Sequence, residues 1–246
     1  MTPTALFVSP HLDDVVFSCG GTLAALADRG WRTVLATVFT ATVVPATGFA
    51  LACQLDKGLA PEIDYMALRR EEDRAAASIL GVSDLRWLGL PEAPHRGYHS
   101  APALFAEPRA DDAIWTSVAD LLSALVVETR PAQIFAPQGL GGHVDHRQVI
   151  RAVQQSAADI PVAWYRDTPY AIRNPAADPF IVAPQAATLP IEAWLERKIR
   201  AACAYDSQIG FQFGGAQQTR EALAAFTARE GGERFSGKLN LGATQP

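Results

Sequence analysis

The chain has 246 residues, of which 49% are hydrophobic and 19% charged, and its formal net charge is −5. These values suit a single domain with a substantial core, and the absence of any Lys- or Arg-rich run argues against a nucleic-acid partner. Cys19, Cys53 and Cys203 are widely spaced and form no CxxC pair, so neither a disulfide framework nor a thiolate zinc site is expected.

Short apolar runs alternate along the chain with longer segments of helical periodicity, which is typical of βαβ units around a parallel sheet. The predicted strands are Thr4 to Val8, Arg32 to Phe39, Leu85 to Leu90, Ala132 to Pro137, Val162 to Tyr165 and Phe180 to Ala183. The predicted helices are Asp13 to Asp28, Met66 to Leu80, Asp111 to Glu128, Asp145 to Ala158, Ile191 to Tyr205 and Gln217 to Ala228. We therefore predict an α/β fold with a Rossmann-like, mainly parallel sheet flanked by helices, as a single domain over residues 1–246.

The sequence shows no apolar stretch that would span a membrane as a helix, and its first residues, MTPTALFVSPHLDD, lack a basic leader. We expect no stable membrane insertion and a cytoplasmic location. The oligomeric state stays open.

A first cluster of polar residues follows the first predicted strand. His11, Asp13 and Asp14 lie on the turn at the carboxyl edge of the sheet, where α/β folds build their sites. Two adjacent carboxylates repel each other, which suggests that a positive group lies between them. Because neighbouring side chains point in different directions, one acid can bind a metal ion while the other faces its water. An Asp N-cap beside an incidental histidine explains these residues equally well.

A second cluster, in the stretch GLGGHVDHRQVI, follows the fourth predicted strand. His143 and His146 are three residues apart, so they face the same side of a first helical turn. An HxxH pair alone is more often a plain surface feature, but two histidine–acid clusters at one sheet edge predict a shared metal site. Imidazole and carboxylate ligands suit Zn²⁺ or another divalent cation. The glycines do not complete a GxGxxG fingerprint, because Val144 stands at the third position, and this disfavours a nucleotide-binding protein.

The motifs SPHLDD and HVDH resemble the PHxDD and HxDH motifs of the LmbE-like, or PIG-L, zinc-dependent de-N-acetylases. The likeness extends over LRREEDRAAASILGVSDLRWLGLPEAPHRG and, more loosely, over KIRAACAYDSQ. The resemblance implies a hydrolase that removes an N-acetyl or other N-acyl group from an amino sugar or related small molecule. It also implies that zinc is held by His11, Asp14 and His146, with Asp13 as the catalytic base.

The resemblance assigns further roles around the metal. His143 is the charged or proton-donating histidine beside the developing oxyanion, and Asp145 steadies an imidazole from behind. Some members carry a tyrosine two residues before the first histidine of HxDH, where this chain has Gly141, so such assistance comes from elsewhere or is absent. Arg69 and Glu92 are candidates for binding sugar hydroxyls, although plain surface positions explain them at least as well.

Two long connections, Thr40 to Glu62 and Pro91 to Arg109, remain to be explained. The first begins with an uncharged segment that would bind an acyl chain or aglycone, cover the cleft, form a subunit contact or pack in the core. The second carries HRGYH, which lines the cleft or lies on the surface. Two other functions stay open: a metal-dependent amidase for N-acyl amino acids or peptide-like substrates, and a non-catalytic metal-containing glycan-binding module. The presence of both Asp13 and His143 argues against the binding module, which needs neither.

Overall fold

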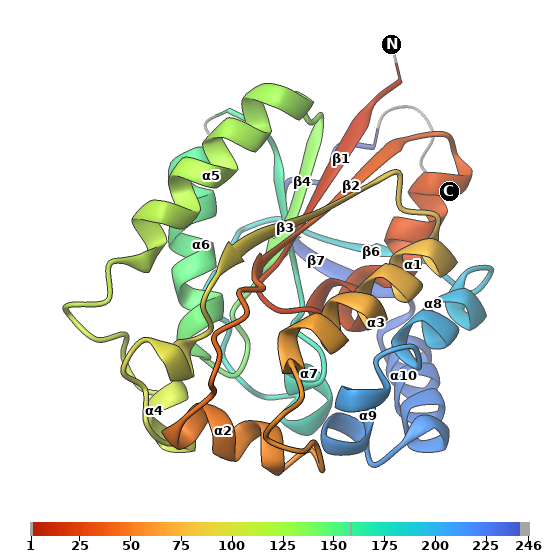
Figure 1. The fold of residues 1–246 in the computed structure, drawn as a ribbon. Coiled ribbons are helices and arrows are strands. Elements are labelled where there is room, and N and C mark those ends of the chain that lie inside the picture. The colour runs from red at the N-terminus through yellow and green to blue at the C-terminus, as the bar shows by residue number, and fades with distance from the viewer. Residues whose placement is uncertain (1, 158, 242–246) are drawn as a thin grey trace.

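The computed structural model describes residues 2–157 and 159–241, which form one seven-stranded sheet with helices on both faces (Figure 1). The strands are β1 (Thr4–Ser9), β2 (Arg32–Phe39), β3 (Asp84–Leu90), β4 (Gln133–Pro137), β5 (Val162–Tyr165), β6 (Ala186–Leu189) and β7 (Glu233–Gly237). The helices are α1 (Asp14–Asp28), α2 (Gly48–Leu55), α3 (Tyr65–Leu80), α4 (Ala101–Leu104), α5 (Ile114–Thr129), α6 (Val144–Ser156), α7 (Tyr170–Arg173), α8 (Leu195–Ala202), α9 (Asp206–Phe213) and α10 (Ala216–Glu230), with a short 3₁₀ turn η1 (Ala93–His95).

The strand order is β3-β2-β1-β4-β5-β7-β6. The first five strands pair in parallel, and β7 runs antiparallel to both β5 and β6. The predicted Rossmann-like, mainly parallel sheet is therefore confirmed. The chain order reverses on either side of β1, whose neighbours are β2 and β4. In open α/β sheets ligands bind outside the carboxyl ends of the strands at such a switch point.

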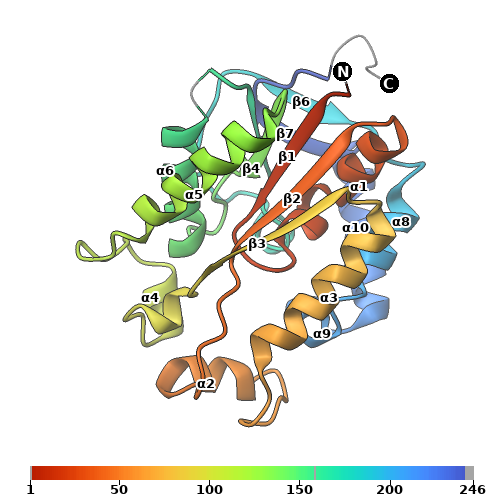
Figure 2. The same cartoon turned by 45° about the horizontal axis from the view of Figure 1, so that its top comes forward.

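The central strands are buried on both faces because their side chains alternate between two apolar cores. Ala5 and Phe7 of β1 pack in the core that also contains residues of α1, α3 and α8. Leu6 and Val8 pack in the opposite core with residues of α5 and α6. Figures 1 and 2 show α5 and α6 on one side of the sheet and α1, α3 and α8 on the other. Both cores hold the strand ends, and so the site, in fixed positions.

Helix α1 is broken in its middle, where the backbone at Cys19 has a non-helical φ of −138°. The freed backbone N–H groups of Gly21 and Thr22 donate to the carboxylate of Glu233 at 2.9 and 2.7 Å. Lys198, which is 1% exposed, pairs with the same carboxylate at 2.7 Å. A β-carbon on Gly21 would lie 2.6 Å from Ile191, so the break and the missing side chain let β7 and the chain before α8 pack closely on α1.

Several predicted elements are wrong in place or kind. Phe180 to Ala183 forms no strand; Phe180 and Val182 are exposed, and the strand lies further on, at β6. The short strand β7 was missed because its sequence, ERFSG, buries a glutamate that only the distant Lys198 neutralises. The helix predicted from Ile191 to Tyr205 is the shorter α8, with α9 as a separate helix. The helix expected to reach Ala158 ends at Ser156, and Ala158 itself lies outside the described residues.

Both long connections contain helices that were not predicted, α2 in the first and α4 in the second. Figures 1 and 2 place α2 beyond the carboxyl ends of the strands, and α4 lies at the same end. Among the residues that the structure describes, no helix is both long and apolar enough to cross a membrane.

Candidate active site

The two polar clusters meet at the switch point of the sheet. His11 and Asp14 follow β1, His146 lies in the first turn of α6 after β4, and β1 and β4 are neighbouring parallel strands. The ring centroids of His11 and His146 are 5.3 Å apart. The structure thus brings two segments together that are far apart in the chain, and a metal ion shared between them stays a prediction.

The loop after β1 sends its two aspartates to different partners. Asp13 precedes α1 with φ 156° and ψ −31°, a conformation that is rare for a residue with a side chain. Its backbone N–H donates to the carbonyl of His11 at 3.0 Å, and its carbonyl accepts from Phe17 at 2.9 Å. Strained backbone of this kind is often kept at functional sites. Here the tight turn directs Asp13 towards Arg69 and Asp14 towards the two histidines.

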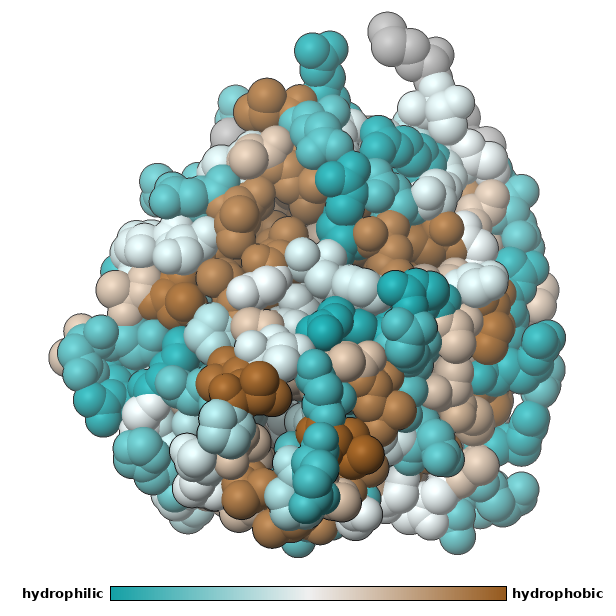
Figure 3. Space-filling model, viewed as in Figure 1, coloured by the Kyte–Doolittle hydropathy of each residue, from teal (hydrophilic) through white to brown (hydrophobic). Residues whose placement is uncertain are grey.

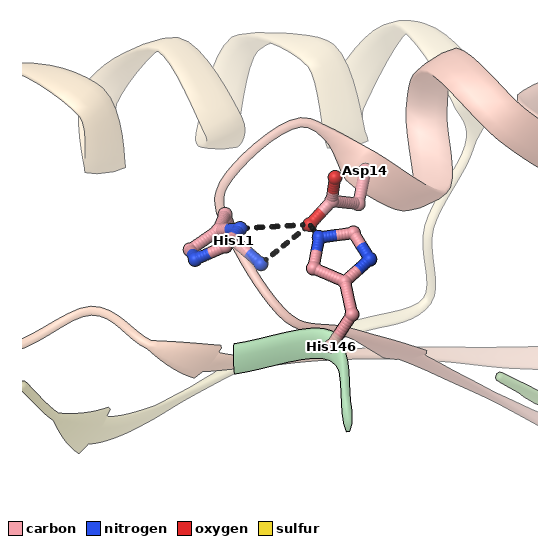
Figure 4. Close-up of side chains that lie close together, drawn as sticks. All are labelled: His11, Asp14 and His146. Carbon is pink, nitrogen blue, oxygen red and sulfur yellow. Dashed lines mark hydrogen bonds and ion pairs between the residues drawn. The ribbon is translucent and has the colours of Figure 1, made fainter. Parts of the chain in front are cut away.

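His11, Asp14 and His146 form a compact group (Figure 4). The Nδ1 atom of His11 lies 3.2 Å and the Nε2 atom of His146 lies 3.3 Å from the same carboxylate oxygen, Oδ2 of Asp14. His146 is fully buried, and its Nε2 makes no hydrogen bond, since the contact with Asp14 lacks hydrogen-bond geometry. A buried polar atom without a hydrogen bond needs another partner, and a metal ion bound between this nitrogen and the carboxylate would provide one.

The other ring nitrogen of each histidine is held by a second carboxylate. Asp145 lies 3.0 Å from Nε2 of His11, and Asp167 lies 2.6 Å from Nδ1 of His146. Such outer carboxylates fix the orientation and tautomer of metal-binding imidazoles and make them better donors. Asp167 was missed in the sequence, although it comes two residues after the strand VAWY, at the same sheet edge as the other acids.

These distances fit a small divalent cation. A tetrahedral ion with bonds of about 2.1 Å separates its ligand atoms by about 3.4 Å, close to the two contacts of Asp14. A second candidate group, His11, His143 and Asp145, suits a cation less well. Both oxygens of Asp145 are already occupied, by Arg96 on one side and by His11 and the N–H of Ala93 on the other.

The charges around the first group reinforce one another. Burial alone lowers the pKa of a histidine, but the carboxylates of Asp14 and Asp167 raise the pKa of His146 to about 9. Burial also lowers the pKa of His11, but the carboxylates of Asp14 and Asp145 outweigh it and raise this pKa well above its usual value. In return, despite its burial, the pKa of Asp14 lies well below its usual value because of His146 and His11. The raised pKa values of His11 and His146 show that the buried carboxylates around them favour positive charge. The same carboxylates would therefore favour a bound cation.

Asp13 lies beside this group and does not belong to it. Its Oδ2 accepts from Arg69 at 3.3 Å, and Arg69 also donates to the carbonyl of Leu12 at 3.0 Å and to Glu92 at 2.7 Å. Burial raises the pKa of Asp13 to about 7, although Arg69 acts in the opposite direction. A carboxyl group with a pKa near neutrality suits proton transfer. Arg69 and Glu92, predicted as sugar contacts, both border the cavity described below, but Arg69 is 4% exposed and occupied chiefly with Asp13, Leu12 and Glu92.

His143 is the N-cap of α6, and its Nδ1 accepts the backbone N–H of Asp145 at 3.2 Å. A neutral ring in this position therefore carries its proton on Nε2. Burial lowers the pKa of His143 to about 3, which outweighs the opposite effect of Asp145. Asp145 makes its side-chain contacts with His11 and Arg96. His143 is thus arranged to donate a hydrogen bond as a neutral ring, and the imidazole that Asp145 steadies is that of His11.

The HRGYH loop divides its roles. His95 borders the cavity. Arg96 is mostly buried behind the site, where it donates to Asp145 at 2.7 Å and to Asp112 at 3.0 Å. Tyr98, which is 2% exposed, also donates to Asp112 at 3.0 Å. Arg96 therefore supports Asp145, Arg96 and Tyr98 both hold Asp112, and neither residue borders the cavity.

The space at Gly141 is filled from another element. Gly141 has φ +82°, and a β-carbon there would lie 2.5 Å from the ring of Tyr170, at the start of α7. That ring packs edge-on against His146, with centroids 5.8 Å apart, and borders the cavity. The chain thus places a tyrosine beside the site after all, from a segment that follows β5.

One cavity of about 770 Å³ lies beside these groups, and His11, Asp13 and Asp14 border it, whereas the fully buried His146 does not. Its inner end, as we call it, is lined by polar residues: His11, Asp13, Asp14, His143, Asp145 and Tyr170. Further out, the lining mixes polar residues such as Gln54, Lys57 and Glu62 with a set of apolar ones, which we call the outer wall: Val43, Val44, Phe49, Ile63, Phe105 and Phe211. Val43, Val44 and Phe49 come from the segment between Thr33 and Gln54, which has no charged side chain.

Residues 6–157 match the profile of the PIG-L family, described as GlcNAc-PI de-N-acetylase. The chain belongs to this family. The resemblance seen in SPHLDD and HVDH is therefore confirmed, and with it the prediction of an N-deacetylase, a hydrolase of amides.

Individual relatives agree with the PIG-L assignment. A 2'-N-acetylparomamine deacetylase of Streptomyces fradiae is 32% identical over 211 residues, which cover 82% of this chain and 72% of the relative. A 1D-myo-inositol 2-acetamido-2-deoxy-alpha-D-glucopyranoside deacetylase of Nocardioides sp. is 31% identical over 180 residues, or 65% of this chain and 56% of that relative. The crystal structure of a deacetylase–bog complex from the biosynthesis pathway of teicoplanin has a TM-score of 0.84 at 26% identity, and covers 95% of this chain and 97% of that one.

Proposed function

We propose that the protein is a zinc-dependent hydrolase that removes the acetyl group from an N-acetylated amino sugar, with His11, Asp14 and His146 as the metal ligands. One observation carries the proposal: a compact group of His11, Asp14 and His146 lies beside a separate buried carboxylate, Asp13, and His11, Asp14 and Asp13 border the inner end of one cavity. A ligand set with a neighbouring base is what metal-assisted hydrolysis requires. The names of the Streptomyces and Nocardioides relatives, both deacetylases of acetamido sugars, support the substrate class.

Zinc, when bound, polarises the amide carbonyl and lowers the pKa of water. Asp13 accepts the proton of the attacking water, and its carboxylate is held in place by Arg69. The Nε2–H of His143 donates to the carbonyl oxygen as negative charge develops there, in a site where such a donor is worth more than in water. Asp13 then returns the proton to the leaving nitrogen, so that acetate and a free amine are formed.

The residues around the site keep these groups oriented. Asp145 and Asp167 hold the imidazoles of His11 and His146. Glu92, at the border of the cavity and paired with Arg69, is placed to accept a hydrogen bond from a sugar hydroxyl. Arg69 contributes to the same polar surface while it positions Asp13.

The test is acetate release from a panel of N-acetylated amino sugars, N-acetyl amino acids and N-acetyl peptides. We expect release from amino sugars that a chelator abolishes and added Zn²⁺ restores. Release only from amino acids or peptides would favour the amidase function instead. Tight sugar binding without any acetate release, after loading with Zn²⁺, Fe²⁺ or Co²⁺, would favour a glycan-binding module. The cytoplasmic location and the single-domain boundaries 1–246 remain predictions alongside this one.

A further inference from the structure

The outer wall of the cavity gathers an unusual share of exposed apolar surface. Ten large hydrophobic side chains among the described residues are exposed, and five of them border this one cavity. These five are Val43, Val44, Ile63, Phe105 and Phe211, with exposed fractions from 39% to 68%. Single exposed apolar residues are ordinary, but a contiguous group around a cavity marks a binding surface.

The wall comes from segments that lie outside the two cores. Val43 and Val44 precede α2, Ile63 precedes α3, Phe105 follows α4 and Phe211 lies on α9. In Figure 3 brown apolar surface interrupts the polar surface over the lower part of the molecule, where Figure 1 places the chain between β2 and α3. Core packing explains why β2 lacks charge, but it does not explain why residues 41–49 do, since none of these residues is buried and Val43 and Val44 are exposed.

The part of the wall near α2 and the part on α9 are held together by Lys57. The ammonium group of Lys57, just after α2, lies 5.0 Å from the ring of Phe211 on α9 and 5.5 Å from the ring of Tyr65. Its Nζ also donates to the carbonyl of Cys53 at 2.9 Å. Cation–π contacts of this kind keep Phe211 beside α2, so the wall exists before a ligand arrives.

The cavity is larger than a monosaccharide needs. An N-acetylhexosamine has about 15 non-hydrogen atoms, and at no more than about 30 Å³ for each, the share of one water molecule in the liquid, it occupies at most roughly 450 Å³. The cavity measures about 770 Å³. An acetyl group adds only a methyl beyond the reacting carbonyl, so the remaining space belongs to whatever the sugar carries.

We propose that the substrate is an N-acetylated amino-sugar glycoside with an apolar aglycone, alkyl or aromatic, and that this aglycone packs on the outer wall while the acetamido group reaches the inner end. The inference rests on the deacetylase function proposed above. The wall forms one continuous cavity with His11, Asp13 and Asp14, which favours a part of the substrate over a second copy of the chain. Burial of the aglycone against Val44 and Phe211 supplies affinity that the polar inner end does not.

The binding test uses reaction products, because these are not consumed. Methyl, hexyl and phenyl glycosides of 2-amino-2-deoxyglucopyranose are titrated calorimetrically into the zinc-loaded protein. We expect the hexyl or phenyl glycoside to bind at least about tenfold more tightly than the methyl glycoside, as burial of several methylene groups or a ring implies. Comparison of the hexyl and phenyl glycosides shows whether the wall prefers a flexible alkyl aglycone or a planar aromatic one. Equal Kd values for all three would overturn the proposal.

The wall is tested with the double variant Val44→Ser, Phe211→Ser, whose sites are 68% and 55% exposed, so folding should persist. The matched control is Val127→Ser, Val182→Ser, two apolar sites that are 74% and 82% exposed and do not border the cavity. The preference for hexyl or phenyl over methyl should fall below about threefold in the wall variant and survive in the control. A preference that survives in both, or a changed oligomeric state of the wall variant with its preference intact, would assign the wall to another role.

Parallel measurement of acetate release from the three N-acetylated glycosides separates the two proposals. A preference in Kd without acetate release from any glycoside would refute the deacetylase function and leave the apolar subsite in place. Equal kcat/KM for methyl, hexyl and phenyl substrates, together with equal Kd values, would refute the subsite and leave the deacetylase function in place.

Discussion

The two ends of the cavity are built in opposite ways. The inner end stands on strand ends and first helical turns, and its polar groups are buried and held by several partners each, as Asp145 is by His11, Arg96 and Ala93. The outer wall stands on connections and exposes apolar side chains such as Val44 and Phe211. Chemistry needs groups fixed to within a fraction of an ångström, whereas recognition of an apolar group needs only area. The rigid sheet therefore carries the reaction, and the loops are free to choose the substrate.

The largest effect that would test this division is expected from His146. His146→Ala removes a fully buried nitrogen donor and leaves Asp14 and Asp167 without their common partner. We expect bound zinc to be lost and kcat/KM to fall by about 10³-fold or more, because metal-assisted hydrolysis is abolished. Metal content by mass spectrometry and acetate release are the measurements. A variant that keeps one zinc per chain would show that the ion is held elsewhere, for example by His11, His143 and Asp145.

Asp13 should behave differently from its neighbour Asp14. Asp13→Asn keeps the side-chain volume beside Arg69 but removes the proton acceptor. Turnover is expected to fall by about 10²–10⁴-fold, the usual contribution of a general base, with zinc content unchanged. Asp14→Asn is the matched comparison, since it should lose zinc as well. Equal loss of zinc in the two variants would contradict the separation of base and ligand.

A smaller effect is expected from the residue behind His146. Asp167→Asn weakens the bond to Nδ1 of His146 while it leaves an acceptor for the N–H groups of Gly139 and Leu140. Zinc affinity should fall by about 10–100-fold, as is typical for the loss of an outer carboxylate. Competition with a fluorescent zinc chelator measures this, with Asp178→Asn as a control in the same part of the chain. An unchanged affinity would mean that packing alone orients the ring.

The inner end was largely predictable from the sequence, and the outer wall was not. The motifs His-x-Asp-Asp and His-x-x-His each follow a short apolar run that predicts a buried parallel strand. Because the carboxyl ends of parallel strands meet at one edge of the sheet, this topology alone places His11, Asp14 and His146 together. Asp167 obeys the same rule but has no repeated motif to draw attention to it. Arg96 and Tyr170 reach the site from loops whose paths depend on tertiary contacts, so no local pattern reveals their partners.

The uncharged segment shows the same limit. Its composition allowed four roles, and the position of α2 beyond the strand ends, which supports the apolar subsite proposed above, could not be read from that composition. The strand expected at Phe180 to Ala183 failed for a related reason, because an apolar run indicates burial only when another element covers it.

The smallest expected effect concerns how firmly the outer wall is attached. The hydroxyl of Thr42 donates to Asp64 at 2.9 Å and accepts from Arg70 at 3.1 Å, which ties the start of the uncharged segment to α3 at an exposed position. Thr42→Val should lower the free energy of unfolding by less than about 1 kcal/mol, because exposed hydrogen bonds contribute little. Hydrogen–deuterium exchange of residues 43–55 should nevertheless become faster.

The control for this variant is Thr116→Val, which removes another exposed hydroxyl bond, to the carbonyl of Ala113, far along the chain on α5. It should leave exchange at residues 43–55 unchanged, and both variants should leave exchange in β1 and β4 unchanged. Faster exchange in the strands of the Thr42 variant would mean that the wall and the inner end open together. The division between a rigid reaction site and an adaptable recognition wall would then fail, because the local stability of a loop that only recognises substrate is independent of the sheet that carries the chemistry.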